Sequence, residues 1–535
     1  MKSIFTPINE IPEEFRIEPL HQREYLCNGE MVQWNGAVDE IYSPVCVPDA
    51  DGNLQRVLVG SVPRITADDA MRGLDAAAAA YNNGLGEWPT MAVSRRIECM
   101  QKFVYLMIQQ RTQVVKLLMW EIGKSYNDSA KEFDRTVEYI NATIDAYKDL
   151  DRQSSRFEQA EGNVAQIRRS PLGVVLSMGP FNYPLNEIFT TLIPALIMGN
   201  TIMFKLPSHG ILLHYPLLKA FQEAFPKGTV NTLYGKGSEI IPPLMESGRI
   251  NVLAFIGSSK VANGLKKQHP KVNRLRAILS LDAKNAAIVT KHANLDVAVS
   301  ECILGALSFN GQRCTAIKLI FVQKDIAEEF VARLSKAVSS LKPGLPWDKD
   351  VKITPLPEPD KPQYLKDCID DAIAKGARIT NENGGEANAS FVFPAVMYPV
   401  NESMRLYHEE QFGPIVPVAP FETIEEPIDY QINASHGMQV SIFSDDPKEV
   451  ASLIDPFVNL VSRVNINAQA QRGPDVFPFT GRKDSAEGTL SITDALRSFS
   501  IRSLVTSKLT EDNKKLFNAI VTDHDSNFLN TDYIF

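Results

Sequence analysis

The stretch GVVLSMGP (173–180) is the first of five apolar runs that decide the fold. The other four are TIMFKLP (201–207), TVNTLYG (229–235), NVLAFIGSS (251–259) and RAILSLDA (276–283). Helix-forming patterns such as PLNEIFTTLIPALIMGN and GILLHYPLLKAFQEAF separate these runs. Strands that are buried on both faces read as continuous apolar runs, so the alternation predicts an α/β fold in which helices cover a parallel sheet.

The pattern continues on both sides of the five runs. Before them, apolar residues near the helical period over 95–123 predict one long amphipathic helix. After residue 284, a helix over 293–309, a strand over 315–323 and a helix over 327–341 begin a second alternation. Since 535 residues exceed what one hydrophobic core usually holds, we expect a second α/β domain there.

Two segments outside the alternation are candidates for subunit pairing. Residues 149–171 are polar, and IRSLVTS (501–507) reads as a lone strand far from either ladder. A strand with an open edge is commonly covered by a neighbouring subunit, so we expect a homo-oligomer, either a dimer or a tetramer.

Charge and cysteine usage narrow the class of protein. A formal net charge of −9 argues against a nucleic acid or an anionic membrane as the main partner. The six cysteines show no CxxC spacing, and no apolar stretch is long enough for a signal peptide or a membrane span. We therefore expect a cytoplasmic protein in a reducing compartment, with no metal site.

The segment FNGQRCTAIK (309–318) contains the residue most suited to nucleophilic chemistry. It places Cys314 after a glycine-containing turn, at the junction of a helix and a strand. Arg313 beside it is expected to lower the thiol pKa by favouring the charged form. A buried packing cysteine is the alternative for an arbitrary cysteine, but the surrounding residues favour a thiolate that attacks a carbonyl carbon.

A second segment, MGPFNYPLN (178–186), runs from a strand end into a helix. The side-chain amide of Asn182, together with a main-chain N–H, is suited to stabilising an oxyanion. Taken alone, a helix-capping asparagine would explain the residue equally well.

These segments belong to a set of motifs that occur in one known order. The motifs are PFNYP, ALIMGN, FKLPS, FIGSS, GQRCTA, MRLYHEEQFGP and QRGPDVFPF. In these motifs the chain resembles the aldehyde dehydrogenase superfamily from about residue 38 to 507, and in particular its non-phosphorylating, NADP-dependent glyceraldehyde-3-phosphate dehydrogenases. The resemblance implies the aldehyde dehydrogenase fold. This fold has a Rossmann-like NADP-binding domain (1–148 and 172–283), an α/β catalytic domain (284–490) and a small β oligomerisation arm with a tail (149–171 and 491–535).

The resemblance also implies roles for individual residues. Cys314 would be the nucleophile, and Asn182 with the Cys314 main-chain amide would form the oxyanion hole. Glu410 and Phe412 would hold the nicotinamide ribose and ring. The residues that would hold the adenosine and phosphates are Lys205, Ser208, Gly237, Gly257 and Ser258.

Coenzyme choice has a physical basis at Ser208. NAD-preferring relatives commonly carry a glutamate there, and a carboxylate would repel a 2′-phosphate. A hydroxyl can instead donate a hydrogen bond to that phosphate while Lys205 supplies positive charge. The sequence therefore favours NADP, with NAD possible.

Substrate choice is suggested by four further positions. The branch that oxidises phosphorylated aldehydes holds the substrate phosphate with three arginines and a tyrosine, and this chain has Arg135, Tyr183, Arg313 and Arg472 at those positions. Arginine forks match phosphate oxygens in two-point geometry. We therefore expect a small phosphorylated aldehyde, glyceraldehyde 3-phosphate first, to be oxidised to the acid.

One position departs from the family. Its general base is a glutamate in a strand reading ELGGK, and the aligned segment here reads SLDAK (280–284), with Ser280 in place of the glutamate. A serine hydroxyl cannot accept a proton from water near neutral pH. Three accounts stay open: Asp282, on the same side of the strand, acts as the base; coenzyme A takes the acyl group, as in CoA-acylating semialdehyde dehydrogenases; or the protein is a non-catalytic cofactor-binding relative.

Overall fold

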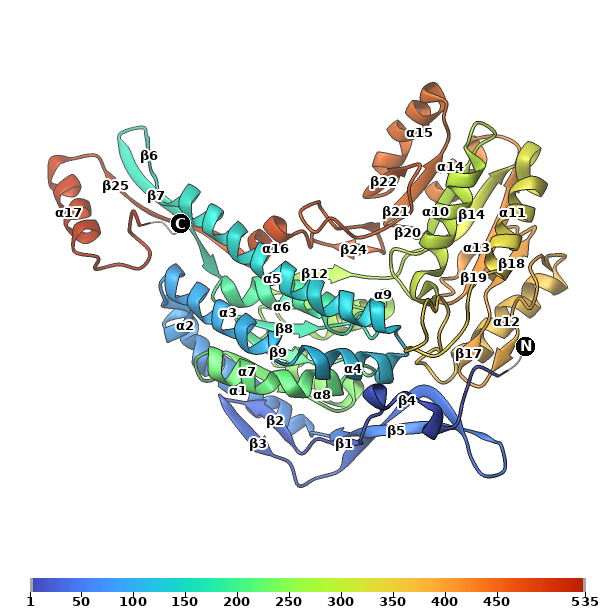
Figure 1. Cartoon of the computed structure of the whole chain (residues 1–535). Helices are drawn as coiled ribbons and strands as arrows, with labels where there is room; N and C mark the ends of the chain where they lie inside the picture. Colours follow the sequence, from blue (N-terminus) through green and yellow to red (C-terminus); the bar gives the residue numbers. More distant parts are fainter. Residues whose placement is uncertain (1–2, 533–535) are drawn as a thin grey trace.

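The five apolar runs form five neighbouring parallel strands in the computed structural model, which describes residues 3–532. They are β8 (Val174–Met178), β9 (Thr201–Lys205), β10 (Val230–Leu233), β11 (Val252–Ile256) and β12 (Arg276–Ser280). The strand order is β10-β9-β8-β11-β12-β24. The sixth strand, β24 (Ala486–Glu487), comes from far along the chain and pairs antiparallel with β12. The predicted parallel sheet is confirmed, and its residues are buried on both faces because helices cover it (Figure 1).

The helices around this sheet are mostly those that the sequence predicts. They include α1 (Ala67–Tyr81), α6 (Asn186–Ile197), α7 (Tyr215–Ala224), α8 (Gly237–Glu246) and α9 (Ser259–Gln268). The single helix expected over 95–123 is wrong, because the chain forms α3 (Val93–Ile108) and α4 (Arg111–Ile122) instead. The two pack on different partners: α3 contacts α7, whereas α4 contacts strand β4 (Val38–Pro48), and both contact the long α5 (Tyr126–Ser154).

The N-terminal residues add short antiparallel pairs beneath the first sheet (Figure 1). Strand β4 pairs with β5 (Leu54–Pro63), and β2 (Glu24–Cys27) pairs with β3 (Glu30–Gln33). The two-residue β1 (Leu20–His21) lies parallel to β5.

The predicted second α/β alternation is also present and forms a seven-stranded sheet of order β15-β18-β19-β14-β13-β21-β22. Its strands are β13 (Asn285–Val289), β14 (Ile317–Gln323), β15 (Arg378–Ile379), β18 (Ala395–Tyr398), β19 (Ile415–Phe421), β21 (Gln439–Phe443) and β22 (Arg463–Ile466). Its helices include α10 (Leu295–Leu307), α11 (Ala327–Ser339), α12 (Lys361–Ala374) and α15 (Pro447–Leu460). The two sheets belong to two lobes that lie side by side (Figure 1).

A third sheet forms an arm that projects from the first lobe (Figure 1). Helix α5 continues to Ser154, so the start of the expected arm segment 149–171 is helical. Strands β6 (Phe157–Ala160), β7 (Asn163–Pro171) and β25 (Ser500–Lys508) follow in the order β25-β7-β6. The expectation of a lone C-terminal strand is wrong, because β25 pairs antiparallel with β7 along its whole length. Helix α17 (Glu511–Thr522) completes the arm, whose role in subunit pairing stays a prediction.

Three observations concern disulfides, membrane spans and metal ions. All six cysteines are free thiols. Within residues 3–532, no helix is long and apolar enough to cross a membrane. The same part of the chain contains no group of three or more His, Cys, Asp or Glu residues arranged to hold a metal ion.

Candidate active site

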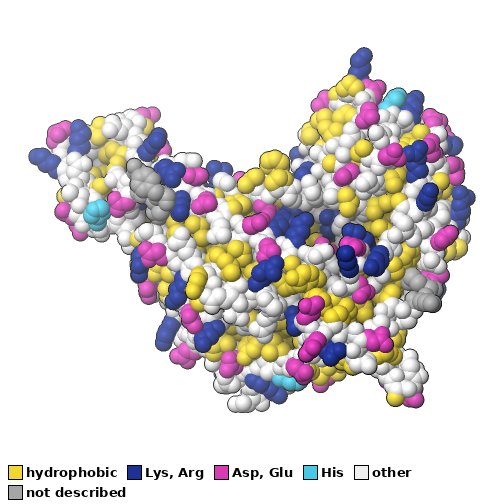
Figure 2. All heavy atoms as spheres, viewed as in Figure 1, with side chains coloured by type: hydrophobic (Ala, Val, Ile, Leu, Met, Phe, Trp, Pro, Cys, Tyr) yellow, Lys and Arg dark blue, Asp and Glu magenta, His cyan; other side chains and the backbone are white. Residues whose placement is uncertain are grey.

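A cavity of about 990 Å³ lies between the two lobes and gathers most of the predicted site residues. The space-filling view shows a hollow there with Lys and Arg side chains around it (Figure 2). Residues at the carboxyl ends of β8, β11 and β12 line the cavity, as expected for ligand binding by a parallel sheet. The predicted residues in its lining are Arg135, Asn182, Tyr183, Ser208, Gly257, Ser258, Ser280, Asp282, Arg313, Cys314, Glu410, Phe412 and Arg472; Lys205 and Gly237 are outside it.

Cys314 is positioned by a sharp turn between helix and strand. After α10, Phe309, Asn310 and Gly311 adopt positive φ angles, and the chain then enters β14 at Ile317. Burial raises the pKa of the Cys314 thiol to about 11; nearby Lys318 and Arg472 oppose this rise. The thiol therefore lies in the cavity at the predicted junction.

The predicted role of Arg313 in lowering the thiol pKa is not supported. Its Nη2 donates to the carbonyl oxygens of Leu304 (3.1 Å) and Gly305 (2.8 Å) near the end of α10. Lys318 and Arg472, not Arg313, are the cations that lower the pKa of Cys314. Arg313 precedes Cys314 in the sequence, but consecutive side chains in a turn point in different directions, so adjacency alone does not bring the guanidinium to the thiol.

Asn182 is fixed next to the Cys314 turn. Its Nδ2 donates to the carbonyl oxygen of Gln312 at 2.7 Å, and its own carbonyl accepts from Lys124 Nζ at 2.8 Å. An asparagine amide carries two hydrogens, so the second Nδ2–H remains for an oxyanion. This arrangement suits the predicted oxyanion-hole role better than helix capping, since Asn182 makes no side-chain bond to the first turn of α6.

A buried ion pair holds the segment that contains Asn182 in place. Lys124 Nζ lies 2.5 Å from Glu132 Oε2, and neither side chain has any exposed surface. Glu132 Oε1 accepts from the main-chain N–H groups of Leu185 and Asn186 at 3.1 Å each. The pair thus ties the start of α5 to the entry into α6, where Asn182 and Tyr183 lie.

The predicted cofactor residues present polar groups and an aromatic ring along one side of the cavity. Ser208 is exposed there, and Ser258 caps α9. Glu410 Oε1 contacts Lys318 Nζ (2.6 Å) and accepts from Ala283 N (3.2 Å), so Oε2 is available for ribose hydroxyls. Phe412 lies edge-on to Phe181, with 5.9 Å between the ring centres.

Lys205 differs from its expectation in one respect. It is buried, its Nζ donates to the Leu206 carbonyl, and burial lowers its pKa to about 8. Gly237 is the first residue of α8 and has open space where a Cβ would lie, so a ligand could approach its backbone.

The four predicted phosphate-binding residues meet in the cavity, but two of the arginines have carboxylate partners. Arg135 makes a two-point contact with Asp475 (3.1 and 2.7 Å). Arg472 pairs with Glu187 and lies 3.5 Å from Asp475. Arg313 keeps its Nη1 and a buried, unpaired Nε. Among the described residues, Arg313 is thus the clamp arginine without a carboxylate partner.

Asp282 lines the cavity, but it does not lie beside Ser280 on a strand as expected, and its role as the base stays a prediction. Strand β12 ends at Ser280, so the strand geometry that would place Asp282 beside it does not extend that far. Asp282 Oδ2 instead accepts from both the N–H and the hydroxyl of Ser259 at 2.7 Å, at the start of α9. This carboxylate is therefore held at a helix N-terminus, where negative charge is stabilised.

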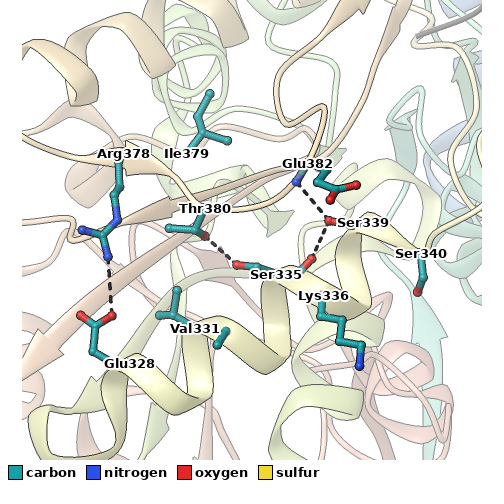
Figure 3. A pocket seen from close by; sticks show the side chains of 11 residues that line it. Glu328, Val331, Ser335, Lys336, Ser339, Ser340, Arg378, Ile379, Thr380 and Glu382 are labelled. Atoms are coloured by element: carbon teal, nitrogen blue, oxygen red, sulfur yellow. Dashed lines mark hydrogen bonds and ion pairs between the residues drawn. The ribbon is translucent and has the colours of Figure 1, made fainter.

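A second pocket lies on the other lobe, between α11 and the strand β15 (Figure 3). Several of its polar groups contact one another: Arg378 pairs with Glu328 at 3.5 Å, and Ser335 bonds to Thr380 at 2.7 Å. It contains no cysteine or histidine in its lining. We assign the chemistry to the cavity that contains Cys314.

Comparison with known proteins agrees with this geometry. The model of the aldehyde dehydrogenase family matches residues 52–505. The chain belongs to the aldehyde dehydrogenase family. The predicted aldehyde dehydrogenase fold is thereby confirmed, and the protein is an enzyme of this oxidoreductase family.

Individual relatives include dehydrogenases of two different aldehydes. The NADP-dependent glyceraldehyde-3-phosphate dehydrogenase of Streptococcus equinus is 32% identical over 84% of this chain and 92% of its own length. The 3-sulfolactaldehyde dehydrogenase of Priestia aryabhattai is 28% identical over 79% of this chain and 87% of its own. The crystal structure of the NADP-dependent glyceraldehyde-3-phosphate dehydrogenase from Bacillus halodurans C-125 complexed with NADP has a TM-score of 0.83 at 29% identity, covering 92% of this chain and 100% of that one.

Sequence reasoning missed two features of the cavity. Glu187 lies one residue beyond the quoted MGPFNYPLN segment, yet it is buried in the cavity wall and pairs with Arg472. Asp475 lies in the QRGPD motif and contacts Arg135 and Arg472. The only sequence signal for Glu187 is that it is the single charged residue of the helix NEIFTTLIPALI.

Proposed function

We propose that this enzyme oxidises a small aldehyde bearing an anionic group, with glyceraldehyde 3-phosphate as the first candidate, to the acid with NADP. The observation that carries the proposal is that Arg135, Tyr183, Arg313 and Arg472 line the same cavity as Cys314. Two similar enzymes act on three-carbon aldehydes with a phosphate or a sulfonate. Arg313, with donors left over, is the residue best placed to bind that anion directly.

The chain's own groups account for the first half of the reaction. The Cys314 thiol first loses its proton to solvent, and the thiolate then attacks the aldehyde carbon. The carbonyl oxygen becomes an oxyanion that accepts from Asn182 Nδ2 and a main-chain N–H. Loss of hydride from the same carbon leaves a thioester on Cys314. NADP, when bound, supplies the hydride acceptor.

The residues around the cavity fit this cofactor. Ser208 offers a hydroxyl where a carboxylate would repel a 2′-phosphate, and Glu410 keeps one free carboxylate oxygen. Phe412 offers an aromatic face near Lys318. Similar enzymes use NADP, and one has been crystallised with it.

The test compares glyceraldehyde 3-phosphate with unphosphorylated glyceraldehyde, following NADPH absorbance. We expect a higher kcat/KM for the phosphorylated aldehyde. Arg313→Lys should reduce this preference roughly 10- to 100-fold, because one charge-assisted two-point contact is lost. The surface variant Arg333→Lys on α11 serves as the control. Reduction of NADP with glyceraldehyde but none with glyceraldehyde 3-phosphate would overturn the substrate assignment.

The alternatives raised by Ser280 predict other time courses. A CoA-acylating enzyme would show one burst of NADPH that CoA converts into steady turnover. A non-catalytic relative would show no burst, although Cys314 would still react with a thiol reagent. We favour hydrolysis, because the cavity holds a carboxylate suited to it.

A further inference from the structure

The cavity contains several carboxylates, but most are already committed to structural contacts. Glu132 accepts three hydrogen bonds beneath the site, and Asp282 is held by Ser259. Glu410 contacts Lys318 and Ala283 on the cofactor side. Asp282 and Glu410 each keep one free carboxylate oxygen, but the charge of Glu410 acts on the Cys314 pKa more weakly than that of Glu187, and Asp282 is not among the main causes of that shift.

Glu187 is different in its contacts. It lies in the first turn of α6, five residues after Asn182, and its side chain is 9% exposed in the cavity wall. Its Oε2 pairs with Arg472 Nη1, and Oε1 has no hydrogen-bond partner in residues 3–532. One carboxylate oxygen is thus oriented by a guanidinium while the other is free.

Glu187 also acts electrostatically on the nucleophile. After burial, its charge is the largest cause of the raised pKa of Cys314, and Arg472 opposes it. Ser280, at the position of the missing base, lines the same cavity. The carboxylate and the thiol therefore share one enclosed space.

We propose that Glu187 is the general base that hydrolyses the Cys314 thioester, replacing the glutamate that is Ser280 in this chain. Glu187 takes a proton from water as the water oxygen bonds to the thioester carbon. The tetrahedral intermediate collapses, the C–S bond breaks, and its electron pair returns to Cys314 Sγ. The acid product and Glu187 each release one proton to solvent. Arg472 is a positioning residue that holds the carboxylate.

The environment of Glu187 suits this role. Burial raises its pKa above the usual glutamate value, while Arg472 and Arg135 lower it and Asp475 and Glu132 raise it. A base with a raised pKa accepts a proton more readily near neutral pH. Since only the ionised form can act, thioester hydrolysis should speed up as pH rises through this pKa.

The inference rests on the proposed function only for its natural substrate, so the test uses two acyl donors. One is glyceraldehyde 3-phosphate with NADP; the other is p-nitrophenyl acetate, which acylates Cys314 without cofactor. The first-turnover burst is NADPH with the aldehyde and p-nitrophenolate with the ester. Glu187→Gln should keep both bursts, whereas the rate of the steady phase that follows should fall by about 10²-fold or more. Adding Ser280→Glu to that variant should restore the steady phase, and wild-type steady turnover should show the pH dependence above.

Each other outcome counts against the proposal. A steady-state rate in Glu187→Gln equal to that of the wild type would overturn it. If Asp282→Asn lost steady turnover after the burst while Glu187→Gln kept it, the base would be Asp282. Loss of the burst in Glu187→Gln would place Glu187 before thioester formation. Steady wild-type turnover only with CoA would exclude water as the acyl acceptor. A Glu187-dependent steady phase with p-nitrophenyl acetate, but none with glyceraldehyde 3-phosphate, would reject that substrate and keep the base.

Discussion

The buried Lys124–Glu132 pair provides a quantitative test of how the site is held. Substituting Lys124→Met keeps an unbranched side chain one atom shorter than lysine but leaves the Glu132 carboxylate enclosed without its cation. Both side chains have 0% exposed surface, and breaking such a pair costs about 3–5 kcal/mol. At about 1.4 kcal/mol per tenfold change, the local opening equilibrium should shift by about 10²- to 10⁴-fold.

The exchange rates of main-chain amide hydrogens measure this local opening. The amides of Leu185 and Asn186 donate to Glu132, so they exchange only when this contact breaks. Their exchange should be faster by the same factor in Lys124→Met. Adding Glu132→Gln should recover most of the protection, because a neutral amide oxygen still accepts from both N–H groups.

A matched surface pair gives the control. Lys266 Nζ lies 2.5 Å from Glu487 Oε2, the same separation, but the side chains are 36% and 49% exposed. Lys266→Met should change stability by no more than about 1 kcal/mol, because solvent screens the pair. Exchange at Leu185 that stays within about threefold of wild type in Lys124→Met would refute the reasoning that burial makes this pair important.

Three further outcomes follow from the site and its surroundings. Asn182→Ala should slow the NADPH burst by about 10²- to 10³-fold in stopped-flow measurements, and an unchanged burst rate would remove it from the oxyanion hole. Ser208→Glu should weaken NADP binding at least about tenfold in fluorescence titrations and affect NAD much less, since a carboxylate repels only the 2′-phosphate. Burial lowers the pKa of His214 from 6.5 to about 3, and the unfolded chain binds the proton first, so stability should fall as pH drops from 6.5 towards 3. His214→Gln should flatten that fall in urea unfolding, and an equal slope in both proteins would contradict it.

The two sheets could be predicted from the sequence because buried parallel strands leave continuous apolar runs. The break between α3 and α4 could not, because no glycine or proline marks residues 109–110 and the choice of packing partners decides it. The pairing of β25 with β7 was implied only by the family resemblance, which places 149–171 and 491–535 in one small β arm, and not by either segment read alone. Strand partners more than 300 residues apart leave no local signal in either segment.

Some residues of the site could be predicted from the sequence and others could not. Cys314 and Asn182 could be predicted because strand ends and turns place them at one edge. The directions of the Arg313 and Asp282 side chains could not, since they depend on carbonyls and amides exposed only in the folded chain. Glu187 reads in the sequence as an ordinary acidic residue at a helix start. Only the fold shows that it is buried in the wall of the cavity that contains Cys314.

The strand β24 has a consequence for how the protein is made. It covers the β12 edge of the first sheet, yet it is translated about 200 residues after β12. At about 5–20 residues per second, that edge stays unpaired on the ribosome for roughly 10–40 s. An open edge with apolar neighbours invites pairing with other chains, so nascent copies on one messenger should depend on chaperones during this interval.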